Sequence, residues 1–278
     1  MNIFHKIFYF LFEKAINKRF LHRPPIETRL SEKQDADLAL VTVAFNNPQV
    51  LEWQLLLCKR FLHDNYLHVI LDNSVSPQAR ALNKDICIRH GASYISLPPN
   101  PWTGIHNSRS HGISLDWAFR HVLPRFSYRV LGLLDHDVFP VEDHTLLAEM
   151  GGRTYMGVLQ ERPGVWYLWP GFFFVRADAF KLDEASMLPT RKTDTGGYLW
   201  HKIFCHINKE EVLFLDEQEC RLRKGESRQS AFYYRIGCWI HTVNASYWNA
   251  CAPKEDNILS ALRQESGIVD LFAVSEKR

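Results

Sequence analysis

The sequence has no paired-cysteine motif and no long apolar run. Its six cysteines lie far apart, without a C-x-x-C pair or zinc-finger spacing, so neither a disulfide framework nor a structural zinc site is indicated. We therefore expect reduced thiols in a cytoplasmic protein. No apolar run reaches the roughly 18–20 residues that cross a bilayer. The N-terminus also lacks the apolar core and small-residue cleavage site of a signal peptide.

The sequence also has little excess charge of either sign. Its 278 residues carry a net charge of +2, with 23% charged and 46% hydrophobic side chains, which argues against disorder and against a nucleic-acid-binding protein. The first 23 residues nevertheless carry a net +4, so the rest of the chain is slightly acidic. Only Glu13 opposes the bases of this segment, which are Lys6, Lys14, Lys18, Arg19 and Arg23.

Apolar residues recur at helical spacing in this basic segment, forming a stripe of Phe4, Ile7, Phe8, Leu11, Phe12 and Ala15. We expect residues 1–25 to hold a basic amphipathic helix that is stopped by Pro24 and Pro25 and lies outside the main fold. A polar linker is expected over residues 26–37. Such a helix fits adsorption to an anionic membrane surface, so residues 1–20 would place the protein at the cytoplasmic face of a membrane. The alternative is that the helix packs on the rest of the chain or on a second subunit.

From residue 38 onward, strand patterns alternate with helix patterns. Strands are expected at 38–45, 67–71, 92–97 and 128–134, with helices at 49–63, 78–90 and 108–122. This order predicts an α/β, Rossmann-like fold whose mostly parallel central sheet is flanked by helices. Further along, the pattern favours strands at 154–160, 166–175, 210–215 and 233–243, and a helix at 197–206.

Polar residues stand at the ends of the first two strands of this series, namely Asn46, Asn47, Asp72 and Asn73. Ligands of such sheets bind beyond the carboxyl ends of the strands, so these side chains are expected to face one crevice. The plainer interpretation is that each only forms a turn.

The sharpest motif is LLDHD, in which an apolar strand ends in Asp135, His136 and Asp137. Carboxylates two residues apart at a strand end can face the same side, where they repel each other unless a cation or a proton intervenes. Mg²⁺ or Mn²⁺ fits, because these ions bind a few carboxylate oxygens and keep positions open for substrate phosphates. His136 is expected to point away from the metal. A polar strand-to-loop turn without a metal is the alternative.

The order of elements and several segments resemble the GT-A glycosyltransferases, in particular the family 2-like group, over roughly residues 38–250. The matching segments are LALVTVAFNN, VILDNS, SRSHGISLDWAF, LLDHD and WPGFFFVRADAF. The resemblance implies a GT-A domain over residues 38–278, with a nucleotide-sugar-binding half (38–137) and an acceptor-binding half (138–278). It also implies transfer of a sugar from a nucleotide-diphosphate sugar to a glycan or lipid-linked acceptor, assisted by Mn²⁺ or Mg²⁺.

On the donor side, the resemblance implies that Ala44, Phe45 and Asn46 line the nucleotide base and that Asp72 binds the base or the ribose. The segment from Arg109 to Ile113 departs from the family's small-residue pattern. The roles of Arg109 and His111 therefore stay open, with Arg109 kept as a donor-binding candidate.

At the metal, the resemblance implies that Asp135 faces the ribose and the metal's water shell, while Asp137 ligates the ion directly. A late histidine supplies a further ligand in many members of this fold, and His241 in the segment CWIHTVNASYW takes that place. A structural role for His241 is the alternative.

On the acceptor side, the resemblance implies an acidic base after the strand in WPGFFFVRADAF. Asp194 takes that place, with Asp183 and Glu184 as reserves, and such a base implies an inverting enzyme. The plainer alternative is that Asp194 caps a helix. Aromatic rings suit the apolar faces of sugars, and four are expected near the crevice: Trp102, Trp166, Tyr167 and Trp169. For Trp117 and Trp200, core packing is preferred.

Two other classes of function remain open. A metal-dependent phosphoesterase would use the same carboxylates, although such sites usually draw on several His and Asp ligands. A non-catalytic carbohydrate- or membrane-binding module would keep the fold without turnover. A nucleotidyltransferase is disfavoured, because the segment AFNNPQV has neither the glycine-rich loop nor the basic residue of such enzymes.

Overall fold

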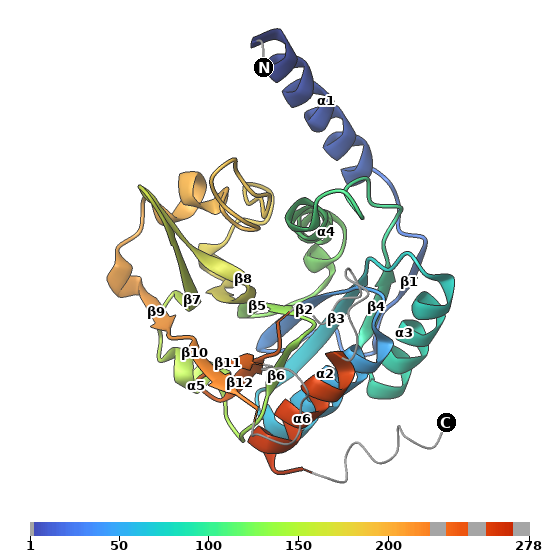
Figure 1. The fold of residues 1–278 in the computed structure, drawn as a ribbon, viewed down its shortest axis with the longest axis vertical. Coiled ribbons are helices and arrows are strands. Elements are labelled where there is room, and N and C mark those ends of the chain that lie inside the picture. The colour runs from blue at the N-terminus through green and yellow to red at the C-terminus, as the bar shows by residue number, and fades with distance from the viewer. Residues whose placement is uncertain (1–2, 223–231, 244–253, 269–278) are drawn as a thin grey trace.

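The computed structural model describes residues 3–222, 232–243 and 254–268, with the backbone alone for residues 3–10, 254 and 255. Its centre is an eight-stranded sheet in the order β1-β4-β3-β2-β5-β8-β7-β9 (Figure 1). The strands are β1 (Glu27–Arg29), β2 (Leu38–Ala44), β3 (Tyr66–Asp72), β4 (Ser93–Ser96), β5 (Val130–Asp135), β7 (Tyr155–Arg162), β8 (Val165–Arg176) and β9 (Val212–Leu215). The pairings β4–β3, β3–β2, β2–β5 and β7–β9 are parallel, and the other three are antiparallel. A large, mostly parallel sheet flanked by helices is therefore confirmed.

Helices cover both faces of the parallel strands. Val41 packs in one apolar cluster with Ile113 and Trp117 of α4 (Asn107–His121). On the other face, Ala44 packs with α2 (Pro48–Phe61) and α3 (Pro77–His90). All seven residues of β2 are buried, which explains why this strand reads as an uninterrupted apolar run.

The strand-end residues close tight connections into the helices. Asn47 caps α2 by accepting a hydrogen bond from the Val50 N–H, and Pro48 occupies the first turn. Ser76 caps α3 in the same way, and Gly91 ends that helix with a left-handed backbone. Asn47 therefore has the structural role that was the plainer interpretation of these residues.

A second, four-stranded antiparallel sheet stands beside the first, in the order β10-β11-β12-β6. Its strands are β10 (Gln218–Arg221), β11 (Phe232–Ile236), β12 (Trp239–His241) and β6 (Val138–Pro140). The single strand expected at 233–243 is wrong: the chain forms a hairpin there, turning at Gly237 with φ +55°. The helix expected at 197–206 is shorter and of another type, since a π-helix of five residues forms there (Trp200–Phe204). The short α5 (Leu146–Met150) and α6 (Lys254–Ser266) complete the regular elements discussed below.

The N-terminal helix α1 (Ile3–Leu21) projects from the body at its N-terminal end and packs against it at the other (Figure 1). The Asn17 side-chain oxygen accepts a hydrogen bond of 2.7 Å from Trp102 Nε1, and Phe20 is buried. The expectation that the helix lies wholly outside the main fold is therefore wrong for its last turns. The expected linker is also partly ordered, because β1 pairs with β4. The side chains of Phe4, Ile7 and Phe8 lie outside the described part of the chain.

Candidate active site

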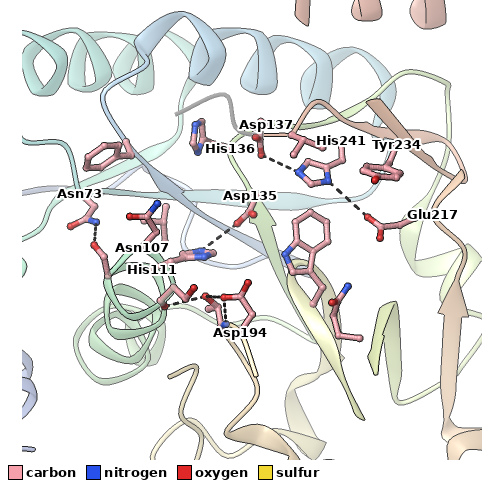
Figure 2. A pocket seen from close by; sticks show the side chains of 18 of the residues that line it. Asn73, Asn107, His111, Asp135, His136, Asp137, Asp194, Glu217, Tyr234 and His241 are labelled. Atoms are coloured by element: carbon pink, nitrogen blue, oxygen red, sulfur yellow. Dashed lines mark hydrogen bonds and ion pairs between the residues drawn. The ribbon is translucent and has the colours of Figure 1, made fainter. Parts of the chain in front are cut away.

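A cavity of about 450 Å³ lies where the two sheets meet α4 (Figure 2). Side chains from many parts of the chain line it, including Phe45 after β2, Asn73 after β3, the turn between β5 and β6, and Trp169 on β8. The cavity lies at the carboxyl ends of the parallel strands, where the sequence placed the crevice.

The turn between β5 and β6 brings Asp135, His136 and Asp137 to the cavity wall. His111 Nε2, on α4, lies 3.5 Å from Asp135 Oδ1, and His241 Nε2, at the end of β12, lies 3.7 Å from Asp137 Oδ1. The structure thus brings both predicted aspartates and the predicted late histidine together. His136 also lines the cavity, and its buried Nε2 has no hydrogen-bond partner among the described residues.

The electrostatics of this group favour a cation. Burial raises the pKa of Asp135 above its usual value, and the Asp137 charge raises it further, while His111 acts in the opposite direction. Burial opposes the charged form of His241, but the carboxylates of Glu217, Asp137 and Asp135 outweigh it and raise its pKa. Negatively charged side chains therefore cluster at this site, and they stabilise positive charge placed among them.

Asp135, Asp137 and His241 offer the carboxylate oxygens and imidazole nitrogen that Mn²⁺ and Mg²⁺ accept, nitrogen suiting Mn²⁺ better. The 3.7 Å between Asp137 and His241 exceeds a hydrogen bond, so their donor atoms are not committed to each other. In the described part of the chain, no group of three or more His, Cys, Asp or Glu side chains is yet arranged around one ion position. The donor atoms of these three residues are of the kinds that a divalent cation binds. A cation there would also offset the repulsion between the two carboxylates.

Two aromatic rings lie beside His241. The Trp169 ring lies 4.5 Å from the imidazole at an interplanar angle of 36°, and the Tyr234 ring lies 6.2 Å away at 30°. On its far side, Nδ1 is 3.9 Å from Glu217 Oε1 (Figure 2). The imidazole thus has a carboxylate near each ring nitrogen, Asp137 at Nε2 and Glu217 at Nδ1, and neither is within hydrogen-bond distance.

Asp194 lies on the wall opposite Asp137 and His241, with Asp135 and His111 between them (Figure 2). Its Oδ1 accepts a hydrogen bond of 2.7 Å from the Thr195 N–H, and its own N–H donates to the Tyr167 hydroxyl. The loop is tied to α4 through Thr195, whose hydroxyl donates to the Ser108 carbonyl. Asp194 does not cap a regular helix, since only turns follow it before Trp200.

Four of the predicted donor-side residues lie outside the cavity lining. Ala44 is buried in β2, and Asn46, with φ +51°, accepts hydrogen bonds from the Val75 and Ser76 N–H groups. Asp72 is fully buried and accepts from Tyr94 and from the Ser74 N–H. Arg109 pairs with Glu13 of α1 and lies 5.2 Å from the centre of the Trp102 ring. Their predicted contacts with a nucleotide therefore gain no support from this geometry, whereas Phe45 does line the cavity.

The predicted aromatic residues divide in the same way. Tyr167 and Trp169 line the cavity, while Trp102 is buried against α1 and Trp166 packs against Trp200. The reserves Asp183 and Glu184 are exposed on the surface, outside the cavity.

Sequence reasoning missed several lining residues, among them Asn107, Glu217 and Tyr234, and left the role of His111 open. His111 stood in a segment already singled out, so its position on the helix before the metal motif was a usable signal. Glu217 and Tyr234 lie at the cavity because the second sheet stands beside the first. No local sequence pattern indicated that sheet.

No protein-family model and no curated protein matches the sequence. Among solved structures, the chain is similar to the mannosyltransferase PcManGT from Pyrobaculum calidifontis in complex with GDP-Man and Mn²⁺. That match has 12% identity and a TM-score of 0.38, and it covers 61% of this chain and 52% of that one, so it spans about half of that protein. The chain is also similar to the mannosyltransferase Ktr4p from S. cerevisiae, with 12% identity and a TM-score of 0.42 over 91% of this chain and 89% of that one.

Proposed function

We propose that the protein is a GT-A, family 2-like glycosyltransferase that moves a sugar from a nucleotide-diphosphate sugar to a glycan or lipid-linked acceptor, with inversion and with Mn²⁺ or Mg²⁺. One observation carries the proposal. The cavity holds a carboxylate pair at the end of a central strand and a third carboxylate, Asp194, on the opposite wall. This arrangement separates a cation-binding side from a base, as transfer from a charged leaving group to a hydroxyl requires.

The donor's diphosphate fits on the side of the cavity that carries Asp135, Asp137 and His241. The start of α4 belongs to the opposite side, because the Thr195 hydroxyl beside Asp194 donates to the Ser108 carbonyl. Phe45 offers a ring face to the base at the other end of the nucleotide.

Asp135, Asp137 and His241 would hold the divalent cation on the diphosphate side. When bound, it offsets the negative charge that grows on the departing phosphate. The chain's own residues surround these ligands: the Trp169 and Tyr234 rings lie beside His241, and His111 Nε2 lies 3.5 Å from Asp135 Oδ1.

The acceptor fits between Trp169 and the Asp194 loop. Tyr167 holds the Asp194 main chain at 3.0 Å, which aims the carboxylate into the cavity. There it can take the proton of an acceptor hydroxyl as that oxygen attacks the anomeric carbon from the side opposite the diphosphate. Such an in-line geometry inverts the anomeric configuration.

We also propose that α1 docks on an anionic membrane surface and brings the enzyme to a lipid-linked acceptor. Leu11 and Phe12 are 57% and 53% exposed, and Ile105, in the loop that Trp102 ties to the helix, is 75% exposed. Lys14, Lys18 and Arg19 are exposed beside them. No helix in the described residues is both long and apolar enough to cross a bilayer.

The deciding assay incubates the protein with a panel of nucleotide sugars, Mn²⁺ and candidate acceptors, and measures released nucleotide diphosphate together with glycosylated product. Asp137→Ala should lower turnover by about 10²-fold or more, since the cation supplies several kcal/mol of transition-state stabilisation. Release of inorganic phosphate instead would support the phosphoesterase. Donor binding without release would support the non-catalytic module. Full turnover in excess chelator, or in Asp137→Ala, would refute the metal assignment.

A further inference from the structure

Helix α2 carries a fully buried amide side chain, Gln54, that reaches the turn between β5 and β6. Gln54 Nε2 donates one hydrogen bond of 2.7 Å to the Asp135 carbonyl and another of 2.8 Å to the Val138 carbonyl. Strand β5 ends at Asp135 and β6 begins at Val138, so these two carbonyls bracket His136 and Asp137. One NH₂ group therefore closes the turn that carries both carboxylates.

The orientation of this amide is itself fixed. Thr42 Oγ1 donates to Gln54 Oε1 at 3.1 Å and lies 3.0 Å from His68 Nε2. Since the only hydroxyl proton of Thr42 goes to Gln54, we assign the donor in the second bond to His68 Nε2. Burial lowers the pKa of His68 to about 3, so the imidazole is neutral and keeps this proton on one nitrogen. The chain from His68 through Thr42 leaves both amide hydrogens of Gln54 for the turn.

The other side of the turn is held by the strand that carries His241. The Thr242 N–H donates to the Asp137 carbonyl at 3.0 Å, one residue after the imidazole. The carbonyls of Asp135, Asp137 and Val138 are thus fixed from two directions, by α2 and by the end of β12. The Asp135 and Asp137 carboxylates on this short turn repel each other. Because its carbonyls are fixed on two sides, the turn resists displacement by this repulsion.

We propose that Gln54 is a positioning residue that sets the directions of the Asp135 and Asp137 carboxylates by clamping the turn between β5 and β6. The proposal rests on the proposed function, because the carboxylates matter as cation ligands. Partners that orient metal ligands are worth about 10- to 100-fold in metal affinity. Gln54 does so through main-chain carbonyls rather than through the ligand side chains.

The test compares Gln54→Met with two controls. Methionine keeps the volume of glutamine but has no N–H to donate. Thr42→Val removes the bond that orients the amide and leaves its two donors in place. Asp64→Asn replaces a buried carboxylate that accepts hydrogen bonds from the Leu146 and Leu147 N–H groups at the start of α5, away from the turn. It serves as a control for loss of stability alone.

Two readouts are needed, both on the full chain at a temperature well below unfolding. The first is amide hydrogen exchange of the peptide containing residues 135–139, without metal. The second is the affinity for Mn²⁺ without substrate, from the electron paramagnetic resonance signal of free Mn²⁺. Gln54→Met should speed exchange in this peptide and weaken Mn²⁺ binding by about tenfold or more. Thr42→Val should have a smaller effect, and Asp64→Asn should change neither readout.

Turn exchange and Mn²⁺ affinity in Gln54→Met that match those of Asp64→Asn would overturn the clamp. Binding of Mn²⁺ by neither the native chain nor any variant would instead remove the metal assignment of the proposed function. In that case the exchange measurement alone tests whether Gln54 clamps the turn. Faster exchange confined to the turn in Gln54→Met supports the clamp, and unchanged exchange overturns it.

Discussion

Asp194 lines the cavity, and among the described residues its carboxylate accepts hydrogen bonds from Thr195 alone. Its Oδ1 accepts from the Thr195 N–H, at 2.7 Å, so the carboxylate is oriented by its own loop. Replacing it with Asn keeps the size and removes the base. Asp194→Asn should therefore lower turnover by about 10²- to 10⁴-fold, the range typical of general-base loss, with donor KM nearly unchanged.

The matched control for this variant is Asp183→Asn, a change of the same kind at an exposed carboxylate of the same loop region. Turnover should stay at the native level there. Near-native turnover in Asp194→Asn, or a product that retains the donor's anomeric configuration, would remove Asp194 from the role of base. Loss of activity in Asp183→Asn would move that role to the reserve residue.

The site residues that could be predicted from the sequence are those whose position follows from the secondary structure directly next to them. Asp135 and Asp137 follow a buried strand directly, so their place at the cavity was predictable. Asp72 also follows a strand, but the Tyr94 hydroxyl bonds it inside the fold, and only tertiary packing determines that contact. Arg109 likewise pairs with Glu13, 96 residues earlier in the sequence, and no local pattern indicates this contact.

One buried carboxylate ties α4 to the segment that carries Asp194. Asp116 accepts hydrogen bonds from the Met187 N–H (2.6 Å) and the Ser186 hydroxyl (2.7 Å). Gly112 on the same helix lets the segment come close, since a Cβ there would lie 2.4 Å from the Met187 carbonyl oxygen. Despite these bonds and the nearby Arg120, burial raises the pKa of Asp116 from 3.8 to about 7.

This shift predicts how stability depends on pH. Below about pH 4 both the folded and the unfolded chain hold the Asp116 proton, so the group costs nothing. Between about pH 4 and 7 the unfolded chain releases it first, so the free energy of unfolding falls as pH rises, by at most about 4 kcal/mol. Asp116→Asn, which cannot ionise, should lack this decline, whereas Asp183→Asn should keep it. Urea unfolding at pH 4, 5.5 and 7.5 measures the difference, and parallel curves for native protein and Asp116→Asn would contradict it.

The N-terminal helix is best tested by point substitution. Removing residues 1–25 would also remove Asn17, Phe20 and Leu21, which pack into the body. Leu11→Ser with Phe12→Ser should instead weaken co-sedimentation with anionic vesicles, and high salt should weaken it further, because basic residues add about 1 kcal/mol each near such a surface. Leu82→Ser, at a residue 54% exposed on α3, is the matched control. Equal sedimentation of the double variant and the control would rule out the membrane contact.

The predictable elements are those with strong periodicity of their own. The strands and helices between residues 38 and 135 alternate cleanly, and the structure has them with boundaries shifted by a few residues. The strands of the second sheet are short, and β12 has only three residues. Such strands form because partners far along the chain meet them, as β6 meets β12, so the sequence around each gave no separate signal.

The two halves predicted for the fold, residues 38–137 and 138–278, interlock in the structure. Strand β5 of the first half pairs with β8 of the second along five residue pairs. Helix α6 returns to pack Ile258, Ala261 and Leu262 in one cluster with Trp53 of α2. The same helix places Glu265 against Tyr233 and Arg235 of β11, next to Tyr234 at the cavity. Neither half has a complete core without the other, so the described chain is expected to unfold cooperatively.

Leu262, which is fully buried in that cluster, tests this cooperativity. Leu262→Ala leaves a cavity between α6 and α2 and should lower the free energy of unfolding by about 2–5 kcal/mol, the usual range for a buried leucine. Because the cluster joins both halves, calorimetry should show one transition moved to lower temperature, with the calorimetric and van't Hoff enthalpies still equal. Leu82→Ala, at an exposed position, should move it little. A separate low-temperature transition in Leu262→Ala, with the main one unmoved, would show that α6 and the second sheet unfold independently of the parallel sheet. The position of Tyr234 beside His241 would then depend on a unit that opens by itself.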